Sequence, residues 1–357
     1  MKLNVGIIGF GRIGAEHAAW IQQTKSVSVG AVYDATPARR ALATARGLQT
    51  VETFEALLGD GRIDAVLIST PTAFHFDPAM KCLAGGKHVM VEKPMALDGP
   101  QALALVEQAE RCGRVLSVFQ NRRWDIDYLT VRAALAGGVM GRVINVESRL
   151  GQFASCVGPA AKEYRPGWRN EGAFGGGGLY DWGSHFVDQM WRLMLPRKPV
   201  RVFAQLRGNV WTSDCDDFAR VCIDFDDGAV GLVEINTTTT RPLPRWHVDA
   251  TGGSASSPPS ATFNTHEWAR LEFTPAPSGA SSGMPGSDVG LMDVKLTEEQ
   301  LTEVDLWTRF ANACAGDGEP AVTARSVLPT MYLLDAARAS SRKGRAVDVT
   351  DLHLHLQ

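Results

Sequence analysis

The order of apolar runs and helix-like segments in residues 1–122 is the feature that most restricts how this chain can fold. Residues 3–9 form an apolar run that ends in glycine, a helix-like stretch covers His17 to Gln23, and a second apolar run covers Val27 to Tyr33. The alternation continues with apolar runs at 65–69, 88–92 and 115–120. Strands that alternate with helices are typical of a parallel, doubly wound sheet. We therefore expect an α/β Rossmann domain over residues 1–122.

The pattern changes after Arg123. A helix-like segment over 129–136 precedes runs in which apolar and polar residues alternate, most clearly at 202–206, 218–225, 230–237 and 246–250. Alternation indicates strands with one buried face, as in an antiparallel sheet. The stretch 252–290 is rich in Ser, Gly, Pro and Ala, which predicts a long, partly ordered excursion from that sheet. We expect an α+β domain over 123–357, with a large, mostly antiparallel open sheet and terminal helices that can pack back on the first domain.

Composition excludes several classes of partner and site. A hydrophobic content of 45% suits a globular protein, and a net charge of -3 gives no field for nucleic acid or an anionic membrane surface. The six cysteines are scattered without a C-x-x-C pair, and Asp214 to Asp217 has the pattern of an exposed turn, so we assign no metal. Met1 to Asn4 leads directly into an apolar strand, which leaves no room for a signal peptide, and no apolar run could span a bilayer. A cytoplasmic protein is expected.

A glycine loop follows the first strand. Gly9, Gly11 and Gly14 have the dinucleotide-binding spacing, Arg12 and Ile13 complete the loop, and Asp34 lies 20 residues past Gly14. The glycines allow backbone N–H groups to approach a pyrophosphate, and Asp34 can accept hydrogen bonds from a ribose. Because a carboxylate repels a ribose 2′-phosphate, the sequence predicts NAD, with NADP as the alternative. Arg39 and Arg40 on the next helix could soften that preference, but we expect them to be solvated helix charges.

Chemically active side chains lie at later strand ends. Thr70 and Pro71 follow the strand at 65–69, so we expect them, with His75, near the cofactor. Lys93 follows the strand at 88–92, in a position where catalytic groups of open α/β sheets gather, and Pro94 restricts its backbone.

A second set of polar residues follows a glycine run at 175–178. Asp181 and His185 are four residues apart, so they share one face of a helix. We expect the glycines to permit close approach of the backbone to a ligand.

These motifs, in this order, resemble the Gfo/Idh/MocA oxidoreductases, the group of glucose-fructose oxidoreductase and inositol dehydrogenases. The resemblance rests on Ser69 to Thr72 with His75, on 84–94 with its Glu92-Lys93-Pro94, and on 178–185, and it extends over essentially the whole chain. It implies a Rossmann domain that binds the cofactor also through Glu92 and Lys93. It further implies that Lys93, Asp181 and His185 are catalytic and contact the substrate. The sheet of the second domain is then expected to mediate a homodimer or homotetramer.

The expected substrate pocket combines aromatic and cationic residues, which suit the C–H face and the hydroxyls of a sugar. Beside Lys93, Asp181 and His185, its predicted members are Arg122, Arg123, Trp124, Tyr164, Trp168 and Arg169. The segment 120–125 with 179–181 is similar to the branch that includes scyllo-inositol dehydrogenases. The sequence leaves open whether the sugar is neutral or acidic.

Three functions remain in view. The leading one is hydride transfer between nicotinamide and a secondary hydroxyl or ketone of a cyclic polyol, sugar or glycoside, with Lys93 and His185 as acid–base groups. The same residues would serve a glycosidase that keeps NAD bound and cleaves by transient oxidation and elimination. A non-catalytic sensor on the same scaffold is the third hypothesis, and retention of all three catalytic residues argues against it.

Overall fold

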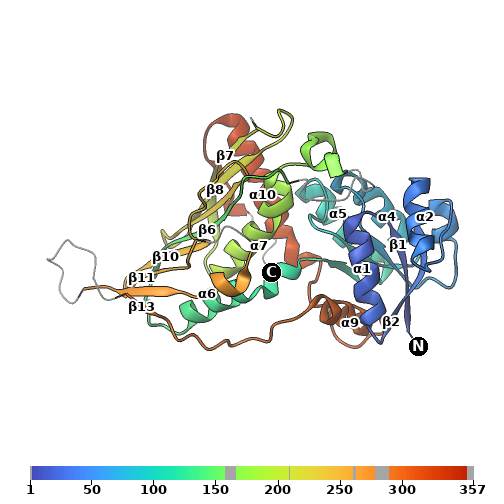
Figure 1. Ribbon diagram of the computed structural model, residues 1–357, viewed down its shortest axis with the longest axis horizontal. Helices are drawn as coiled ribbons and strands as arrows, with labels where there is room; N and C mark the ends of the chain where they lie inside the picture. Colours follow the sequence, from blue (N-terminus) through green and yellow to red (C-terminus); the bar gives the residue numbers. More distant parts are fainter. Residues whose placement is uncertain (1, 157–165, 209, 260–262, 278–288, 352–357) are drawn as a thin grey trace. The chain divides into compact units, whose positions relative to one another are not determined.

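The computed structural model describes residues 2–156, 166–208, 210–259, 263–277 and 289–351 (Figure 1). The chain divides into two compact units. The first contains the residues up to Asn121, the described part of 157–176, and Leu301–Met331. The second contains Arg122–Cys156, the described part of 177–300, and the described residues from Tyr332 onward. Each unit is therefore assembled from segments that lie far apart in the sequence.

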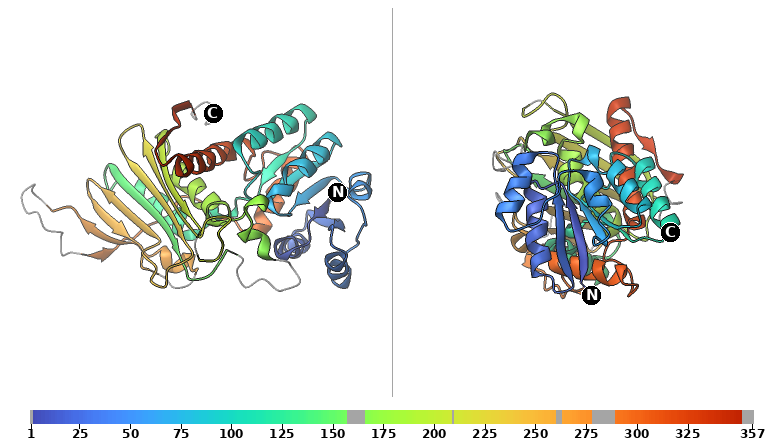
Figure 2. Two further views of the ribbon diagram at one scale, coloured as in Figure 1. Left: turned by 90° about the horizontal axis from the view of Figure 1, so that it is seen from above. Right: turned by 90° about the vertical axis from the view of Figure 1, so that its right-hand side faces the viewer.

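The first unit contains the parallel sheet that the alternating pattern predicts. Its strand order is β2-β1-β3-β4-β5, and all neighbouring pairs are parallel. The strands are β1 (Leu3–Ile8), β2 (Val27–Tyr33), β3 (Ala65–Ile68), β4 (His88–Val91) and β5 (Leu116–Val118). Every residue of β3 and β5 is buried, because helices cover both faces of the sheet (Figure 2, right). The predicted doubly wound fold is confirmed.

The helices of the first unit come mostly from the connections between these strands. They are α1 (Arg12–Gln23), α2 (Pro37–Ala45), α3 (Phe54–Leu58), α4 (Phe76–Ala84), α5 (Gly99–Cys112) and α9 (Glu303–Cys314), with short 3-10 turns η1 (Thr72–Phe74), η4 (Pro166–Asn170), η5 (Gly172–Phe174) and η7 (Arg325–Val327). Both α9 and η7 come from the C-terminal segment 301–331, and α9 packs against α1. Because β1 and β3 are neighbours in the sheet, the loops that follow them lie side by side at its carboxyl edge.

The second unit is built on a nine-stranded, mostly antiparallel sheet, as predicted. Its order is β13-β12-β11-β10-β6-β9-β8-β7-β14, and only β6 and β9 pair in parallel. The strands are β6 (Val143–Gly151), β7 (Pro199–Arg207), β8 (Phe218–Phe225), β9 (Val230–Asn236), β10 (Trp246–Ala250), β11 (Gly253–Ser256), β12 (Glu272–Pro275), β13 (Gly290–Leu291) and β14 (Val347–Asp348). The strand β6 is not among those that the sequence predicts. In the described part of 252–291, β11, β12 and β13 extend the sheet, so these residues are more regular than we predicted.

Helices cover one face of this sheet. The helical segments of the second unit are η2 (Asn121–Trp124, which begins at the last residue of the first unit), α6 (Ile126–Ala136), η6 (Leu179–Gly183), α7 (Ser184–Leu193), α8 (Thr265–Trp268) and α10 (Leu328–Lys343, whose first turn belongs to the first unit). Of these, α6, α7 and α10 lie on the same side of the strands (Figure 2, left). Among the described residues, no helix combines the length and the apolar character needed to cross a membrane.

A buried ion pair holds α7 inside the second unit. Arg123 donates from Nε and Nη2 to the two carboxylate oxygens of Asp188 over 2.7 and 2.8 Å. Side-chain exposure is 5% for Arg123 and 1% for Asp188. Two parallel charge-assisted bonds satisfy both groups where water cannot reach them.

We predict that Arg123→Ala destabilises the protein by about 3–5 kcal/mol, because it leaves the Asp188 carboxylate buried without its main counter-charge. Urea denaturation of the purified variant would measure the loss. Arg132→Ala is the matched control, since its pair with Glu298 is exposed and such pairs contribute about 1 kcal/mol or less. Equal losses in the two variants would contradict the structural role of the Arg123–Asp188 pair.

Candidate active site

The glycine loop after β1 forms a cradle that only glycine fits. Gly9 has a φ of 91°, and a Cβ there would lie 2.9 Å from the backbone of Ser69 and Thr70. A Cβ on Gly14 would lie 2.2 Å from the carbonyl oxygen of Gly9. By contrast, no atom lies within 4 Å of the Cβ position of Gly11, at the first turn of α1, where no side chain caps the helix. Open space in front of free helical N–H groups fits a dinucleotide pyrophosphate.

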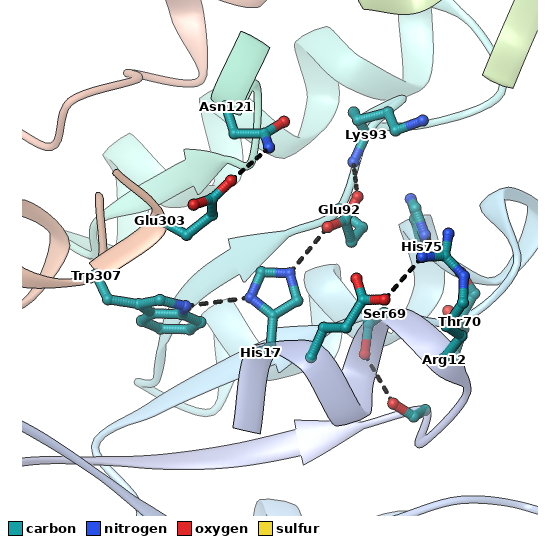
Figure 3. Close-up of polar contacts among 12 residues, drawn as sticks. Arg12, His17, Ser69, Thr70, His75, Glu92, Lys93, Asn121, Glu303 and Trp307 are labelled. Carbon is teal, nitrogen blue, oxygen red and sulfur yellow. Dashed lines mark hydrogen bonds and ion pairs between the residues drawn. The ribbon is translucent and has the colours of Figure 1, made fainter. Parts of the chain in front are cut away.

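The loop after β3 is fastened to this cradle. Ser69 donates from Oγ to the carbonyl oxygen of Gly9 over 2.7 Å (Figure 3). Thr70 donates from Oγ1 to the carbonyl oxygen of Phe74 over 2.9 Å, which fixes the turn that begins at Pro71. Both loops therefore present backbone to the space beyond the sheet edge.

A cavity of about 490 Å³ opens at this edge, within the first unit. It is lined by Ile8, Gly9, Tyr33, Asp34, Ala35, Thr36, Arg39, Phe54, Glu55, Ser69, Thr70, Pro71, Phe74, Asp77, Pro78, Lys81, Trp168 and Phe174. Four predicted cofactor residues, Gly9, Asp34, Thr70 and Pro71, are among them. Aromatic walls beside three carboxylates and two cations suit an adenosine moiety. The other predicted loop residues, Arg12 and Ile13, lie in the first turn of α1, and Arg12 pairs with Glu16 at the surface.

The Asp34 carboxylate has hydrogen-bond and ion-pair partners within the protein that the sequence does not predict. Its carboxylate accepts hydrogen bonds from the backbone N–H of Phe10 over 2.7 Å and of Thr36 over 2.8 Å. Nη1 of Arg39 lies 3.6 Å from Oδ2 of Asp34, and Arg40 donates to the Asp34 carbonyl oxygen over 2.7 Å.

The two arginines are therefore not the solvated helix charges that we expected. The Arg39 side chain is only 15% exposed, and its Nε is buried without a hydrogen-bond partner. A guanidinium in the cavity wall offsets the repulsion that Asp34 would exert on a 2′-phosphate.

Lys93 follows β4 and is half-buried, with a cis peptide bond to Pro94. Its backbone N–H donates to Oε2 of Glu92 over 3.0 Å (Figure 3). Glu92 itself is 7% exposed. Burial opposes its ionisation, but the hydrogen bond from His17 and the charge of Lys93 outweigh that effect and hold the pKa of Glu92 below its usual range. A carboxylate, not a carboxylic acid, therefore supports Lys93.

His75 is buried at 1% exposure, between the loops after β3 and β4. Its Nδ1 lies 2.9 Å from the carbonyl oxygen of Pro94, and its Nε2 lies 2.9 Å from that of Thr70. Burial lowers the pKa of His75, so the ring is neutral and can donate to only one carbonyl at a time. His75 therefore links the backbones of the two loops, and its expected place beside the cofactor stays a prediction.

Asp181 and His185 belong to the second unit, whereas Lys93 belongs to the first. Asp181 lies in the π-helical turn η6 and is half-buried, and His185 lies in the first turn of α7 and is 4% exposed. Short π-helical segments are often found at functional sites. The helix that the sequence predicts is present, and its first turn is wider than an α-helix.

The glycine run before this helix serves internal packing. A Cβ on Gly175 would lie 2.8 Å from Cβ of Thr72, and one on Gly176 would lie 2.4 Å from the carbonyl oxygen of Arg169. A Cβ on Gly177 would lie 2.4 Å from Oδ1 of Asp216. Our expectation that these glycines leave room for a ligand is therefore wrong, because protein atoms occupy the space.

Asp216 anchors the start of the helical segment that carries Asp181 and His185. Its Oδ2 accepts from the backbone N–H of Leu179 over 2.7 Å, and its neighbour Asp217 accepts from the N–H groups of Val210 and Trp211. Burial raises the pKa of Asp216 to about 7, with a further contribution from the charge of Asp217, against the opposing hydrogen bonds. The segment 214–217 is therefore an anchoring turn, and the prediction that it is simply exposed is wrong for Asp216 and Asp217.

The predicted substrate residues are divided between the two units. Trp168 lines the cavity of the first unit, where Arg169 lies over its ring at 4.5 Å. In the second unit, Arg122 lies over the rings of Trp182 and Phe263, and Arg123 is committed to Asp188. Trp124 is half-buried in η2. Tyr164 lies outside the described residues. A contact with substrate stays a prediction for all of them.

Residues that sequence analysis missed also belong to the site. His17 is fully buried in α1, where its Nε2 lies 2.8 Å from Oε1 of Glu92, and Trp307 of α9 donates to its Nδ1 over 3.1 Å (Figure 3). His17 follows Gly14 by three residues, about one helical turn, which is a weak signal. Trp307 has no local signal.

For the cavity, we predict that Arg39→Ala weakens NADP binding about tenfold or more and leaves NAD binding nearly unchanged. The reason is that a charge-assisted hydrogen bond to a 2′-phosphate is lost, worth about 1.5–3 kcal/mol. Isothermal titration with each cofactor would measure both affinities. Arg62→Ala, at an exposed pair with Asp60 outside the cavity, is the control. Equal weakening of both cofactors would refute the assignment of Arg39.

For Asp216, we predict a pH-dependent effect on stability. Because its folded-state pKa of about 7 exceeds the unfolded value of about 4, the folded state binds the proton more tightly. This contribution is fully present below about pH 4 and is lost as pH rises to about 7. Asp216→Asn accepts the same hydrogen bond without ionising, so wild type should lose more stability than the variant between pH 5 and pH 8 in urea denaturation. Identical pH profiles would contradict the raised pKa.

Two family models match the chain in succession. The Gfo/Idh/MocA model for an oxidoreductase family with an NAD-binding Rossmann fold covers residues 3–120, and the model for the Gfo/Idh/MocA C-terminal domain covers residues 128–256. A solved structure of an NAD-binding protein from Listeria innocua superposes with a TM-score of 0.85 at 27% identity, covering 100% of this chain and 99% of that one.

Curated relatives match over shorter stretches. The uncharacterized oxidoreductase YdgJ of Escherichia coli K12 is 37% identical over 215 residues, which is 60% of this chain and 60% of the relative. The NADP-dependent scyllo-inositol 2-dehydrogenase IolW of Bacillus subtilis 168 is 29% identical over 177 residues, 50% of this chain and 47% of the relative. The matches thus span about half to three fifths of these relatives. With both family models matched in order over an NAD-binding Rossmann fold, the chain belongs to the Gfo/Idh/MocA family of oxidoreductases.

Proposed function

We propose that this protein interconverts a secondary hydroxyl and a ketone on a cyclic polyol, sugar or glycoside, with NAD or NADP as hydride carrier. The observation that carries the proposal is the Lys93 loop, placed at the carboxyl end of β4 beside an ionised Glu92, in a unit that also holds the glycine cradle. The name of the Bacillus relative makes inositols the first substrates to test.

The proposed chemistry needs two acid–base groups beside the hydride carrier. A nicotinamide cofactor held at the glycine loop would supply the hydride acceptor for the carbinol carbon, or the hydride donor for the ketone. In the oxidative direction the hydroxyl proton passes to the imidazole of His185, the C–H pair leaves as hydride, and the C=O bond forms. Lys93 Nζ donates a hydrogen bond to the same oxygen, and Asp181 orients the substrate or His185. Imidazole suits this task because its ordinary pKa lies near neutrality.

The proposal includes assembly and location. The face of the nine-stranded sheet away from the helices exposes Ile144 and Phe203, at 47% and 40%. We propose that this face joins copies of the chain into a homodimer or homotetramer. All six cysteines are free thiols, which suits the reducing cytoplasm where we place the activity.

We predict that Lys93→Ala and His185→Ala each lower turnover by about 10²–10⁴-fold, the range for a lost acid–base group, while cofactor affinity is nearly kept. The measurement is NADH or NADPH formation across inositols, aldoses, uronic acids, sulfonated sugars and aryl glycosides, followed by kinetics on the best substrate. Lys25→Ala and His266→Ala, both at exposed positions, are matched controls.

Each alternative function has its own outcome in this experiment. Release of aglycone from aryl glycosides without net NADH would replace the proposal with oxidation–elimination glycoside cleavage. Inactivity on the whole panel, despite cofactor binding, would favour a sensor. If both variants keep near-wild-type turnover on the best substrate, the acid–base assignment is wrong.

A further inference from the structure

A line of buried polar groups runs from α9 to the backbone of Lys93. The indole Nε1 of Trp307 lies 3.1 Å from Nδ1 of His17, and Nε2 of His17 lies 2.8 Å from Oε1 of Glu92. The other oxygen of Glu92 accepts from the Lys93 N–H over 3.0 Å. Figure 3 shows the four residues in this order. Neither the family resemblance nor the proposed chemistry assigns a task to His17 or Trp307.

The partners fix the direction of every hydrogen bond in the line. An indole N–H can only donate, so Nδ1 of His17 accepts from Trp307. The proton of the neutral imidazole is then on Nε2, which donates to Glu92. Trp307 thereby selects the His17 tautomer that holds the carboxylate.

His17 is enclosed and can act only through its partners. Its side chain is fully buried, and the rings of Trp20, Phe119 and Trp307 have centroids 4.9, 4.3 and 5.6 Å from its own. It cannot touch a substrate or exchange protons directly with solvent. Burial of an ionised carboxylate such as Glu92 is unfavourable unless the group is paired and hydrogen-bonded. His17 supplies the hydrogen bond to the oxygen that Lys93 does not use.

We propose that His17 is a positioning residue for Lys93, which it orients by fixing the Glu92 carboxylate that binds the Lys93 backbone. The inference rests on the proposed acid–base role of Lys93. On the far side of the loop, His75 contacts the carbonyl oxygen of Pro94, so the Lys93–Pro94 bond is held from both ends. His17 thus sets both the place of the lysine and the negative charge beside it.

The start of α9 is anchored so that Trp307 reaches His17. Thr302 and Asp305 form a capping box at the first turn of the helix. Asn121 donates to Glu303 over 3.2 Å, which ties the same turn to the end of the segment after β5 (Figure 3). A C-terminal segment therefore completes the support of a loop that lies about 200 residues earlier.

The test compares His17→Phe with His17→Gln. Phe removes the hydrogen bond to Glu92, and we expect kcat to fall by roughly one to two orders of magnitude, as for a misplaced catalytic group, with KM and cofactor affinity nearly kept. Gln can accept from Trp307 and donate to Glu92, so it should restore most of the activity.

A second readout needs neither substrate nor cofactor. Reductive ¹³C-methylation followed by NMR titration reports the ionisation of Lys93 in the cofactor-free protein. In His17→Phe an unsupported, buried Glu92 takes up a proton, so Lys93 loses the adjacent negative charge and should titrate at lower pH than in wild type. His17→Gln should titrate as wild type does.

Ser117→Ala is the structural control. It removes the bond from Ser117 Oγ to the Val322 carbonyl oxygen, 2.7 Å long, which ties the same C-terminal segment to β5 away from His17. We expect a lower melting temperature with unchanged kcat per folded molecule and unchanged Lys93 titration. If His17→Phe gives this same pattern, His17 is merely structural and the inference is overturned.

Two further outcomes are decisive. If His17→Phe does not fold, Trp307→Phe replaces it, because Phe keeps an aromatic ring but removes the N–H that selects the His17 tautomer. It should shift kcat and the Lys93 titration in the same direction by less, and no shift in either overturns the inference. If Lys93→Ala keeps full turnover, the proposed acid–base role of Lys93 fails, while the Lys93 titration still decides whether His17 positions it.

Discussion

The buried carboxylate of Glu92 is the constraint on which the arrangement around the candidate active site depends. An ionised group at 7% exposure must find its partners inside the protein, because the desolvation cost is otherwise several kcal/mol. Glu92 finds them in the imidazole of His17 and the backbone N–H of Lys93. These hydrogen bonds join α1 to the end of β4, and the bond from Trp307 to His17 adds α9. The same carboxylate places negative charge beside the lysine, so packing and the proposed acid–base chemistry share one physical cause.

At the neighbouring glycine loop, close backbone packing leaves no room for side chains at two positions. Gly9 and Gly14 are required because any Cβ would strike backbone, and their close packing leaves the N–H groups of the first α1 turn facing open space. At the end of β2, two charged side chains set the electrostatic potential in this space. Asp34 has two backbone amides to satisfy, and Arg39 stands close enough to moderate its field. We therefore expect preference between NAD and NADP to depend on the balance between these two opposite charges in one cavity wall.

The second unit uses the same rule that a buried charge must be matched. The Asp188 carboxylate accepts two hydrogen bonds from the Arg123 guanidinium. Asp216 and Asp217 accept hydrogen bonds from backbone N–H groups of a helix start and a loop. The Arg123–Asp188 pair holds α7, which carries His185. The bond from Leu179 to Asp216 holds the start of η6, which carries Asp181. The glycine run belongs to this packing, since Gly177 makes room for the Asp216 carboxylate. Residues outside the proposed acid–base set thus hold the helical segment that carries Asp181 and His185.

Local and periodic features could be derived from the sequence, because they depend on neighbouring residues. The alternating strands and helices gave the doubly wound sheet, the glycine spacing gave the cradle, and polar alternation gave β7 to β10. The strands β6, β11, β12, β13 and β14 were missed, since their pairing depends on partners elsewhere in the sheet. By itself the sequence determined the fold class, the cofactor loop and the candidates Lys93, Asp181 and His185. Only the tertiary structure decided which charges those groups meet. His17 and Trp307 lie 290 residues apart and Asp216 follows Leu179 by 37, and no local pattern encodes contacts that exist only after the chain has packed.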